Sequence, residues 1–222
     1  MLGAVNHEQA AKSLRDDAAD RVAVDGRHGV AIHPLPQRDV VGVGPEVSIK
    51  RKRSAAEPFT LTSPAFKDGD VWPSKFAGAN PARTNPPCPG QNISPPLAWS
   101  NAPPATRSFA ILMFDPDGAN GLGSVHWVAY GIPPTKTSFA EGEASSAPND
   151  FVAGKNNVGT DHYFGPCGPA GHALHHYVIT VIATDLAPDA LKSGLSRDEL
   201  VKELRGHALV PASIVGRYTR PQ

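Results

Sequence analysis

One short segment of the sequence concentrates most of the residue types that perform chemistry. The run GPCGPAGHALHHYVITVIA, residues 165–183, holds one cysteine, three histidines and a tyrosine between a glycine- and proline-rich loop and an apolar stretch. Histidine can carry a proton near neutral pH, bind a metal or act as a base, and a cysteine thiolate is a nucleophile. The segment therefore predicts either an elaborate turn before a strand or a site built from that turn and the first strand residues.

Two further apolar runs place an ionisable side chain at one end. The run RSFAILMFD ends on Asp115, directly before a proline, and VHWVAYGI carries His126 near its start. Side chains alternate between the two faces of a strand, so His175 and Tyr177 share one face at the entrance of the third run. If these strand ends meet, they form a cluster of one acid, two imidazoles and a phenol. The alternation permits this meeting without requiring it.

Each member of this cluster also has an ordinary structural explanation. An aspartate before a proline is common in turns, and a histidine beside Trp127 is often a hydrogen-bonded core residue. Tyr177 fits a core position with its hydroxyl at the rim. Taken one at a time, these explanations are favoured. Their joint occurrence at three strand ends favours a site.

The elements that would position these residues are short strands joined by turns. Glycine and proline number 21 and 23 among 222 residues, which indicates many turns and few long helices. A capping-box pattern from Ser196 to Glu199 predicts one late helix, with Gly206 as its candidate end. This pattern favours a mainly β, antiparallel sandwich over alternating strands and helices. The strands are expected over residues 59–63, 97–100, 107–115, 125–132, 175–185 and 209–219.

The first part of the chain differs from the rest, so residues 1–57 are predicted to be an extension and residues 58–222 the folded domain. Residues 8–22 are compatible with a helix whose apolar face is mostly alanine, which would be marginal alone. Residues 50–53 are four basic side chains. A solvated linker is favoured for them over a nucleic-acid or acidic-lipid contact. An arm that docks an acidic protein partner is a separate hypothesis.

Charge and composition limit the partners and the compartment. Lys+Arg and Asp+Glu are both 21, so the formal net charge is zero and no broad nucleic-acid surface is expected. No apolar run approaches the roughly 18 residues of a transmembrane segment, and the N-terminus lacks a secretory pattern, so a cytoplasmic location is expected. In that compartment Cys88 and Cys167 are expected to be free thiols, with a disulfide between them left open.

Five stretches of the sequence resemble the phosphatidylethanolamine-binding proteins, and are most similar to the bacterial branch called Raf-kinase-inhibitor-like proteins. They are LTSPAFKDGD, NISPPLAWSNAPPATRSFAILMFDPDG, VHWVAYGIP, GPCGPAGHALHHYVITVIATD and LVPASIVGRYTR. They occur in the order of the family between Phe59 and Arg220, which makes the resemblance specific. The N-terminal segment has no counterpart in the family core.

The resemblance implies a Greek-key β-sandwich with a few short peripheral helices and a pocket for phosphate, acetate or a phospholipid headgroup such as phosphorylethanolamine. It implies neither a cofactor nor a metal ion. The sequence departs from the family pattern in DPDGANG and at Gly168, and both changes loosen the rim of the expected pocket. Carried over by motif, the ligand-binding residues are Asp115, His126, His175 and Tyr177, together with the loop residues Gly165, Pro166, Gly168 and Pro169.

In this interpretation the loop glycines let backbone amides approach an anion. A protonated His126 or His175 supplies charge, and Tyr177 donates a hydrogen bond. Asp115 orients a histidine, and binding weakens as the histidines lose their protons with rising pH. The expected function is non-catalytic binding of a small anion or headgroup, with inhibition of a kinase or protease as a regulatory extension.

The same residues allow an enzymatic alternative. Asp115, His126 and His175 could form a two-histidine, one-carboxylate metal site, or Cys167 could act as a nucleophile, and either arrangement would make a hydrolase. If Cys88 lay close to Cys167, a disulfide or a redox role would follow instead. The histidines outside the family pattern are assigned to loops or to the opposite strand face: His162, His172 and His176.

Overall fold

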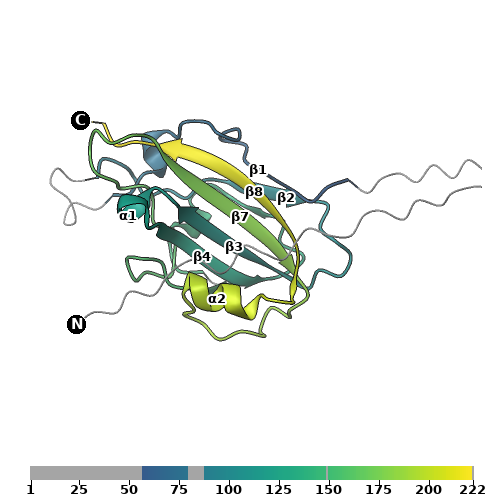
Figure 1. Ribbon diagram of the computed structural model, residues 1–222. Helices are drawn as coiled ribbons and strands as arrows, with labels where there is room; N and C mark the ends of the chain where they lie inside the picture. Colours follow the sequence, from purple (N-terminus) through teal and green to yellow (C-terminus); the bar gives the residue numbers. More distant parts are fainter. Residues whose placement is uncertain (1–56, 80–87, 149, 222) are drawn as a thin grey trace, which may run out of the picture. The chain divides into compact units, whose positions relative to one another are not determined.

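The computed structural model describes residues 57–79, 88–148 and 150–221 of the chain, and two antiparallel sheets organise them (Figure 1). The larger sheet has the strand order β6-β4-β3-β7-β8, formed by Val152–Ala153, Ser124–Ile132, Ser108–Asp115, His175–Thr184 and Ala208–Tyr218. The smaller sheet has the order β1-β2-β5, formed by Thr60–Thr62, Leu97–Ser100 and Ser138–Phe139.

The two sheets share one apolar core. Ile111 and Ile179 of the larger sheet and Trp99 of the smaller one are buried in the same cluster of apolar side chains. The outer face of β3 and β4 packs instead against Leu200 of helix α2 (Arg197–Glu203), which Figure 1 shows beside β4. The strand patterns therefore fold as the expected mainly β, antiparallel sandwich.

A long return of the chain joins the two halves of the larger sheet. Strand β3 pairs with β4 on one side and with β7 on the other, both antiparallel. Between β4 and β7 the chain passes through β5 in the smaller sheet and β6 at the edge of the larger one. This non-local connection is the Greek-key feature that the family resemblance implied.

The helical elements are short. Besides α2, they are α1 (Gly118–Gly121) and the 3-10 turns η1 (Ser74–Phe76) and η2 (Glu143–Ser145). The predicted capping box begins α2, since the Ser196 hydroxyl accepts the Glu199 N–H and the Glu199 carboxylate accepts the Ser196 N–H at 2.8 Å. Within the described ranges, the helices lack the length and apolar character needed to cross a bilayer.

The six predicted strands are found within one residue of their expected limits, and β5 and β6 are additional. On β7, Tyr177 and Ile179 are buried whereas His176 is exposed and Val178 is half-buried. The strand is therefore fully covered on one face only. The predicted extension up to residue 56, its helix over residues 8–22 and the basic residues 50–53 lie outside the described residues.

A close contact between Trp72 and the backbone of β8 connects the core to the start of β7. A Cβ added at Gly216 would lie 1.8 Å from Cε2 of Trp72. The indole is only 3% exposed and stacks on the ring of Tyr177, with centroids 5.7 Å apart. Glycine at position 216 therefore lets Trp72 support a residue that the sequence assigned to the site.

We expect Gly216→Ala to lower the free energy of unfolding by about 1–3 kcal/mol, because the buried indole has no space into which to move. Gly168→Ala is a matched control, since its Cβ would meet only the His175 ring at an ordinary distance of 3.5 Å. That control should change stability by less than about 0.5 kcal/mol. Denaturant unfolding of both variants measures the difference, and equal losses would contradict the packing argument.

Candidate functional site

The residues that the sequence singled out lie at one end of the larger sheet. Asp115 ends β3 and pairs with Ser124 at the start of β4, while Phe114 pairs with Val178 near the start of β7. Antiparallel pairing therefore brings the end of β3 between the beginnings of β4 and β7. Figure 1 shows α1 at this end, directly after β3.

Asp115 is the centre of the cluster and is only 3% exposed. Its Oδ2 atom lies 2.9 Å from Nδ1 of His175 and 3.9 Å from Nε2 of His126. Its Oδ1 atom accepts the N–H groups of Asp117 and Gly118 at 2.9 and 3.0 Å. The carboxylate thus faces two imidazoles with one oxygen and closes the turn after β3 with the other.

These partners set the protonation of Asp115. Burial is the largest single influence and by itself would raise the pKa of this carboxyl. The polar contacts with His126 and His175, together with the positive charge of these rings when protonated, act in the opposite direction and outweigh burial, so the pKa of Asp115 lies below its usual value. Asp115 is therefore a carboxylate throughout the neutral pH range.

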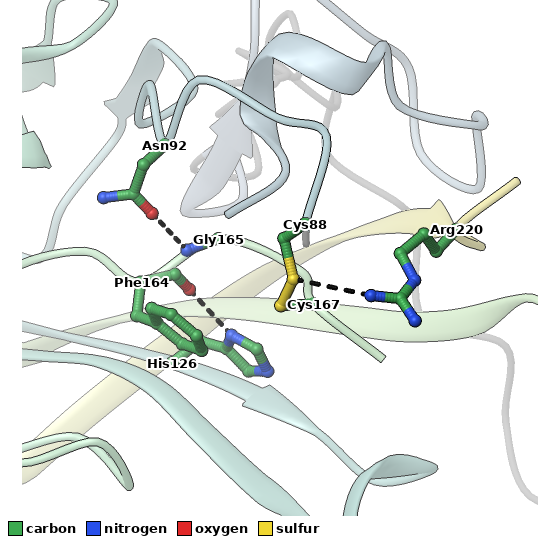
Figure 2. Close-up of a disulfide and its surroundings, with 7 residues drawn as sticks. All are labelled: Cys88, Asn92, His126, Phe164, Gly165, Cys167 and Arg220. Carbon is green, nitrogen blue, oxygen red and sulfur yellow. Dashed lines mark hydrogen bonds between the residues drawn. A yellow bond between two sulfur atoms is a disulfide. The ribbon is translucent and has the colours of Figure 1, made fainter. Parts of the chain in front are cut away.

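The ring of His126 is fixed by Phe164, directly before the loop over residues 165–171. Its Nδ1 atom lies 2.7 Å from the carbonyl oxygen of Phe164, and the two rings stack with centroids 5.7 Å apart (Figure 2). The Phe164 N–H in turn donates to the carbonyl of His126 at 3.0 Å. Because Nδ1–H donates to a carbonyl, a second proton on this ring occupies Nε2, which faces Asp115.

Tyr177 forms the buried back of the cluster. Its ring stacks beside that of His175 at 6.4 Å and meets the edge of His126 at 5.1 Å. Burial, followed by the nearby charge of Asp115, raises the pKa of the Tyr177 hydroxyl well above its usual value. The hydroxyl therefore keeps its proton and can only act as a neutral hydrogen-bonding group.

The loop over residues 165–171 plays a more structural part than the sequence predicted. The N–H of Gly165 donates to Oδ1 of Asn92 at 2.8 Å, and the carbonyl of Pro166 accepts the N–H of Gly78 at 2.8 Å. A Cβ at Gly165 would lie 2.3 Å from the carbonyl oxygen of Phe76. Glycine at position 165 thus permits close backbone packing, and its amide is already bonded within the protein.

Only the second half of the loop reaches the cluster. Gly168 lies against the His175 ring, since an added Cβ would be 3.5 Å from Cε1 of that ring. Pro166 and Pro169 have no N–H to offer an anion. Among the loop residues, only the backbone N–H groups of Gly168 and its neighbours are therefore candidates for contact with an anion. Ligand binding by the loop stays a prediction.

The expectation of free thiols is wrong, because Cys88 and Cys167 form a disulfide with their Cα atoms 5.7 Å apart (Figure 2). The two residues are 79 positions apart in sequence, so only the folded chain brings them together. The bond fastens the loop to the segment that contains Asn92. It also removes the thiol nucleophile of the enzymatic alternative, since a disulfide sulfur carries no thiolate.

An open cavity of about 320 Å³ lies on the His126 side of the cluster. Its lining is formed by Ser124, Val125, His126, Asn157, Val158, Phe164 and Cys167. On the other side His175 and Tyr177 border a hollow of about 10 Å³, enough for one water molecule. Asp115 lines neither space. This placement is consistent with a carboxylate that orients the two histidines without contacting a ligand in the cavity.

Sequence reasoning missed several residues around these spaces. Phe164 and Asn157 line the larger cavity, and Tyr218 and Arg220 line the smaller hollow. Arg220 is only 6% exposed, and its charge opposes the rise in the pKa of Tyr218 that burial causes. An aromatic residue directly before the loop and an arginine at the end of the last motif were the signals available in the sequence.

The three histidines outside the family pattern lie in loops or on the exposed face of β7, as expected, and one of them also lines the smaller hollow. His176 is exposed and pairs with Asp117 at 2.8 Å, and His162 pairs with Asp161 at 3.0 Å. His172 is exposed but lines the smaller hollow. Across the described ranges, no group of three histidine, cysteine, aspartate or glutamate side chains is arranged to hold a metal ion.

The fold and the cluster together define a β-sandwich protein with a small polar site at one end of its larger sheet. Residues 62–219 match the family model described as phosphatidylethanolamine-binding protein. The chain belongs to the phosphatidylethanolamine-binding protein family.

Relatives and solved structures agree with this assignment. A UPF0098 protein of Methanothermobacter thermautotrophicus is 35% identical over 162 residues, which cover 72% of this chain and 98% of that protein. LppC of Mycobacterium tuberculosis, which is named as a lipoprotein, is 39% identical over 140 residues, 61% of this chain and 62% of LppC. None of these names denotes an enzyme.

The crystal structure of E. coli YbcL, described as a new member of the mammalian PEBP family, superposes with a TM-score of 0.65 at 30% identity. The alignment covers 72% of this chain and 98% of YbcL. The homologue CT736 from Chlamydia trachomatis gives a TM-score of 0.60 at 29% identity, covering 73% of this chain and 97% of that one. The predicted family and fold are confirmed.

The lowered pKa of Asp115 has a consequence for stability at acid pH. A carboxyl whose pKa is lower in the folded state stabilises the fold fully above its unfolded pKa, and this stabilisation is lost as the pH falls through the folded pKa. We expect Asp115→Asn to be less stable than the wild type by about 2–3 kcal/mol at pH 7, because it loses charge-assisted hydrogen bonds.

This difference should shrink as the pH falls from about 5 toward 2. Denaturant unfolding at several pH values measures it. Asp117→Asn is the control, because the pKa of Asp117 is also lowered, first by its hydrogen bonds with His176, but on an exposed surface. A difference for Asp115→Asn that stays constant down to pH 2 would contradict the assigned ionisation.

Proposed function

We propose that this protein binds a small anion or a phospholipid headgroup, such as phosphate or phosphorylethanolamine, without catalysing a reaction. One observation carries the proposal: two imidazoles are held around a single buried carboxylate beside an open cavity of about 320 Å³. The predicted ligand residues Asp115, His126, His175 and Tyr177 are neighbours at this point.

The charge of the cluster favours an anion when both histidines are protonated. Asp115 contributes one negative charge, so one protonated imidazole makes the trio neutral and two make it singly positive. A site of this kind gains affinity for anions as the pH falls. The neutral hydroxyl of Tyr177 adds a hydrogen-bonding group but no charge, which makes the histidines the source of the pH dependence.

The size and lining of the cavity suit a headgroup rather than a large ligand. A volume of about 320 Å³ is at the small end of ligand-binding pockets. Val125, Val158 and Phe164 give it apolar walls, while His126 and Asn157 give it polar ones. A compact ligand with a charged end and a short hydrocarbon part matches that lining.

The enzymatic alternatives have less support than they had from the sequence. The thiol-dependent hydrolase is contradicted by the disulfide, and the metal-dependent one has no three-residue ligand set in the described part of the chain. Inhibition of a kinase or a protease, which the resemblance to Raf-kinase-inhibitor-like proteins implied, stays a prediction about an unidentified protein partner.

The disulfide also bears on the compartment. Disulfides form and persist mainly in oxidising environments such as the periplasm or the cell exterior. Cys88 and Cys167 are the only cysteines of the chain and they are paired. We therefore favour an oxidising compartment over the cytoplasmic location expected from the sequence.

Calorimetric titration with phosphate and with phosphorylethanolamine at pH 6 and pH 8 tests the proposal. We expect tighter binding at pH 6 than at pH 8, because protonated imidazoles bring positive charge to the site. His126→Ala should abolish the gain, since it removes the imidazole that lines the cavity.

His207→Ala is the matched control for that experiment. His207 pairs with Asp185 at 2.8 Å, beside the start of β8 and away from the site. It should leave both affinities unchanged. Absence of binding at both pH values in the wild type would refute the proposed function.

A deletion tests the predicted division of the chain at residue 57. The family match begins at residue 62, so we expect a chain of residues 58–222 to fold and to bind phosphate within about twofold of the full chain. Circular dichroism and the same calorimetric titration measure both properties. Loss of folding would mean that the N-terminal segment completes the core, contrary to the proposed domain boundary.

A further inference from the structure

The disulfide forms part of the wall of the larger cavity. Cys167 is half-buried and lines that cavity together with His126, whereas Cys88 is buried, with 7% of its surface exposed. A thiol that enters the cavity from solvent therefore meets the sulfur of Cys167 first. The sulfur of Cys88 lies on the protected side of the bond.

A buried cation lies next to the protected sulfur. Nη1 of Arg220 is 3.9 Å from Sγ of Cys88, as the dashed line in Figure 2 shows. A neighbouring guanidinium stabilises a thiolate, and a more stable leaving thiolate makes thiol–disulfide exchange faster. The two sulfurs thus differ in the way that thiol–disulfide exchange requires. The sulfur of Cys167 is accessible to an attacking thiolate, and the sulfur of Cys88 is stabilised as the leaving thiolate.

We propose that the Cys88–Cys167 bond is a thiol-exchange site entered through the anion cavity, and that its reaction partner is a small thiol carrying an anionic group. The inference rests on the proposed function, because the cavity must attract anions. His126 would hold the anionic group while the thiolate reaches Cys167. Attraction and positioning of this kind raise the local concentration of a reactant by about tenfold or more.

The exchange proceeds in two balanced steps. The incoming thiolate forms a bond to Sγ of Cys167, the Cys88–Cys167 bond breaks, and its electron pair leaves on Sγ of Cys88 beside Arg220. A second molecule of the small thiol then attacks the sulfur of the first, which releases Cys167 as a thiolate. The protein gains two electrons and two thiols, and two small thiols become one disulfide.

The test uses the oxidised full chain and three probe thiols of similar size: anionic 2-mercaptoethanesulfonate, neutral 2-mercaptoethanol and cationic cysteamine. Alkylation and mass spectrometry count the protein thiols over time. Each rate is divided by the rate of the same thiol with a small reference disulfide, which corrects for intrinsic reactivity. We expect the sulfonate to be about tenfold faster than the neutral thiol, to saturate, and to be inhibited by phosphate.

Two variants separate the parts of the proposal. His126→Ala should bring the ratio of sulfonate to neutral rates close to one, because the anion loses its partner. Arg220→Lys should slow all three thiols by a common factor, because it replaces a guanidinium beside the leaving sulfur with a differently placed ammonium. Arg205→Leu, an exposed arginine beyond α2, is the control and should change no rate. Peptide mapping should locate the first mixed disulfide on Cys167.

The outcomes distinguish this inference from the proposed function. Equal normalised rates for the three thiols, or a mixed disulfide on Cys88, would overturn the inference while phosphate binding in calorimetry kept the proposed function intact. Absence of phosphate binding would overturn both. The wild-type rates and the phosphate competition need no variant, so a variant that fails to fold does not block the test.

Discussion

The hydrogen bond between the buried carboxylate of Asp115 and the half-buried ring of His175, 2.9 Å long, is the interaction on which this end of the protein depends. A buried carboxylate is costly unless charged and polar partners surround it. Here one oxygen faces His175 and His126, and the other accepts two N–H groups of the turn after β3. One side chain therefore fixes the turn, the start of β7 and the orientation of the imidazoles.

The aromatic residues behind the cluster decide which way its polar atoms face. Trp72 lies against Gly216 and stacks on Tyr177, which in turn backs both imidazoles. Phe164 covers one side of His126 and binds its Nδ1 through a backbone carbonyl. Apolar rings thus cover part of each imidazole, while His126 borders the larger cavity and His175 the smaller hollow. The packing that stabilises the core therefore also orients the imidazole rings of the site.

Sequence patterns were enough to predict six strands but not the two-residue strands β5 and β6, and alternation along the strands singled out Asp115, His126, His175 and Tyr177 because a strand repeats every two residues. It could not predict contacts made by loops. The loop that contains Gly165 has a composition typical of anion-binding loops, but the N–H of Gly165 donates to the side chain of Asn92, 73 residues earlier. Cys88 and Cys167 are distant in sequence and are brought together only when the chain folds. The expected cytoplasmic location led to the prediction that they are free thiols. Arg220 gave no periodic signal, since it follows the last strand.

The loop over residues 165–171 explains why the disulfide and the cavity belong together. It contributes one isolated bridge, between Ala170 and Arg220, in place of a strand ladder. Its position therefore depends on a few side-chain and backbone hydrogen bonds, on close packing at Gly165 and on the bond from Cys167 to Cys88. Because Cys167 is itself part of the cavity wall, a change in the redox state of that bond must alter the wall. The shape of the pocket and the oxidation state of the two cysteines are therefore physically linked.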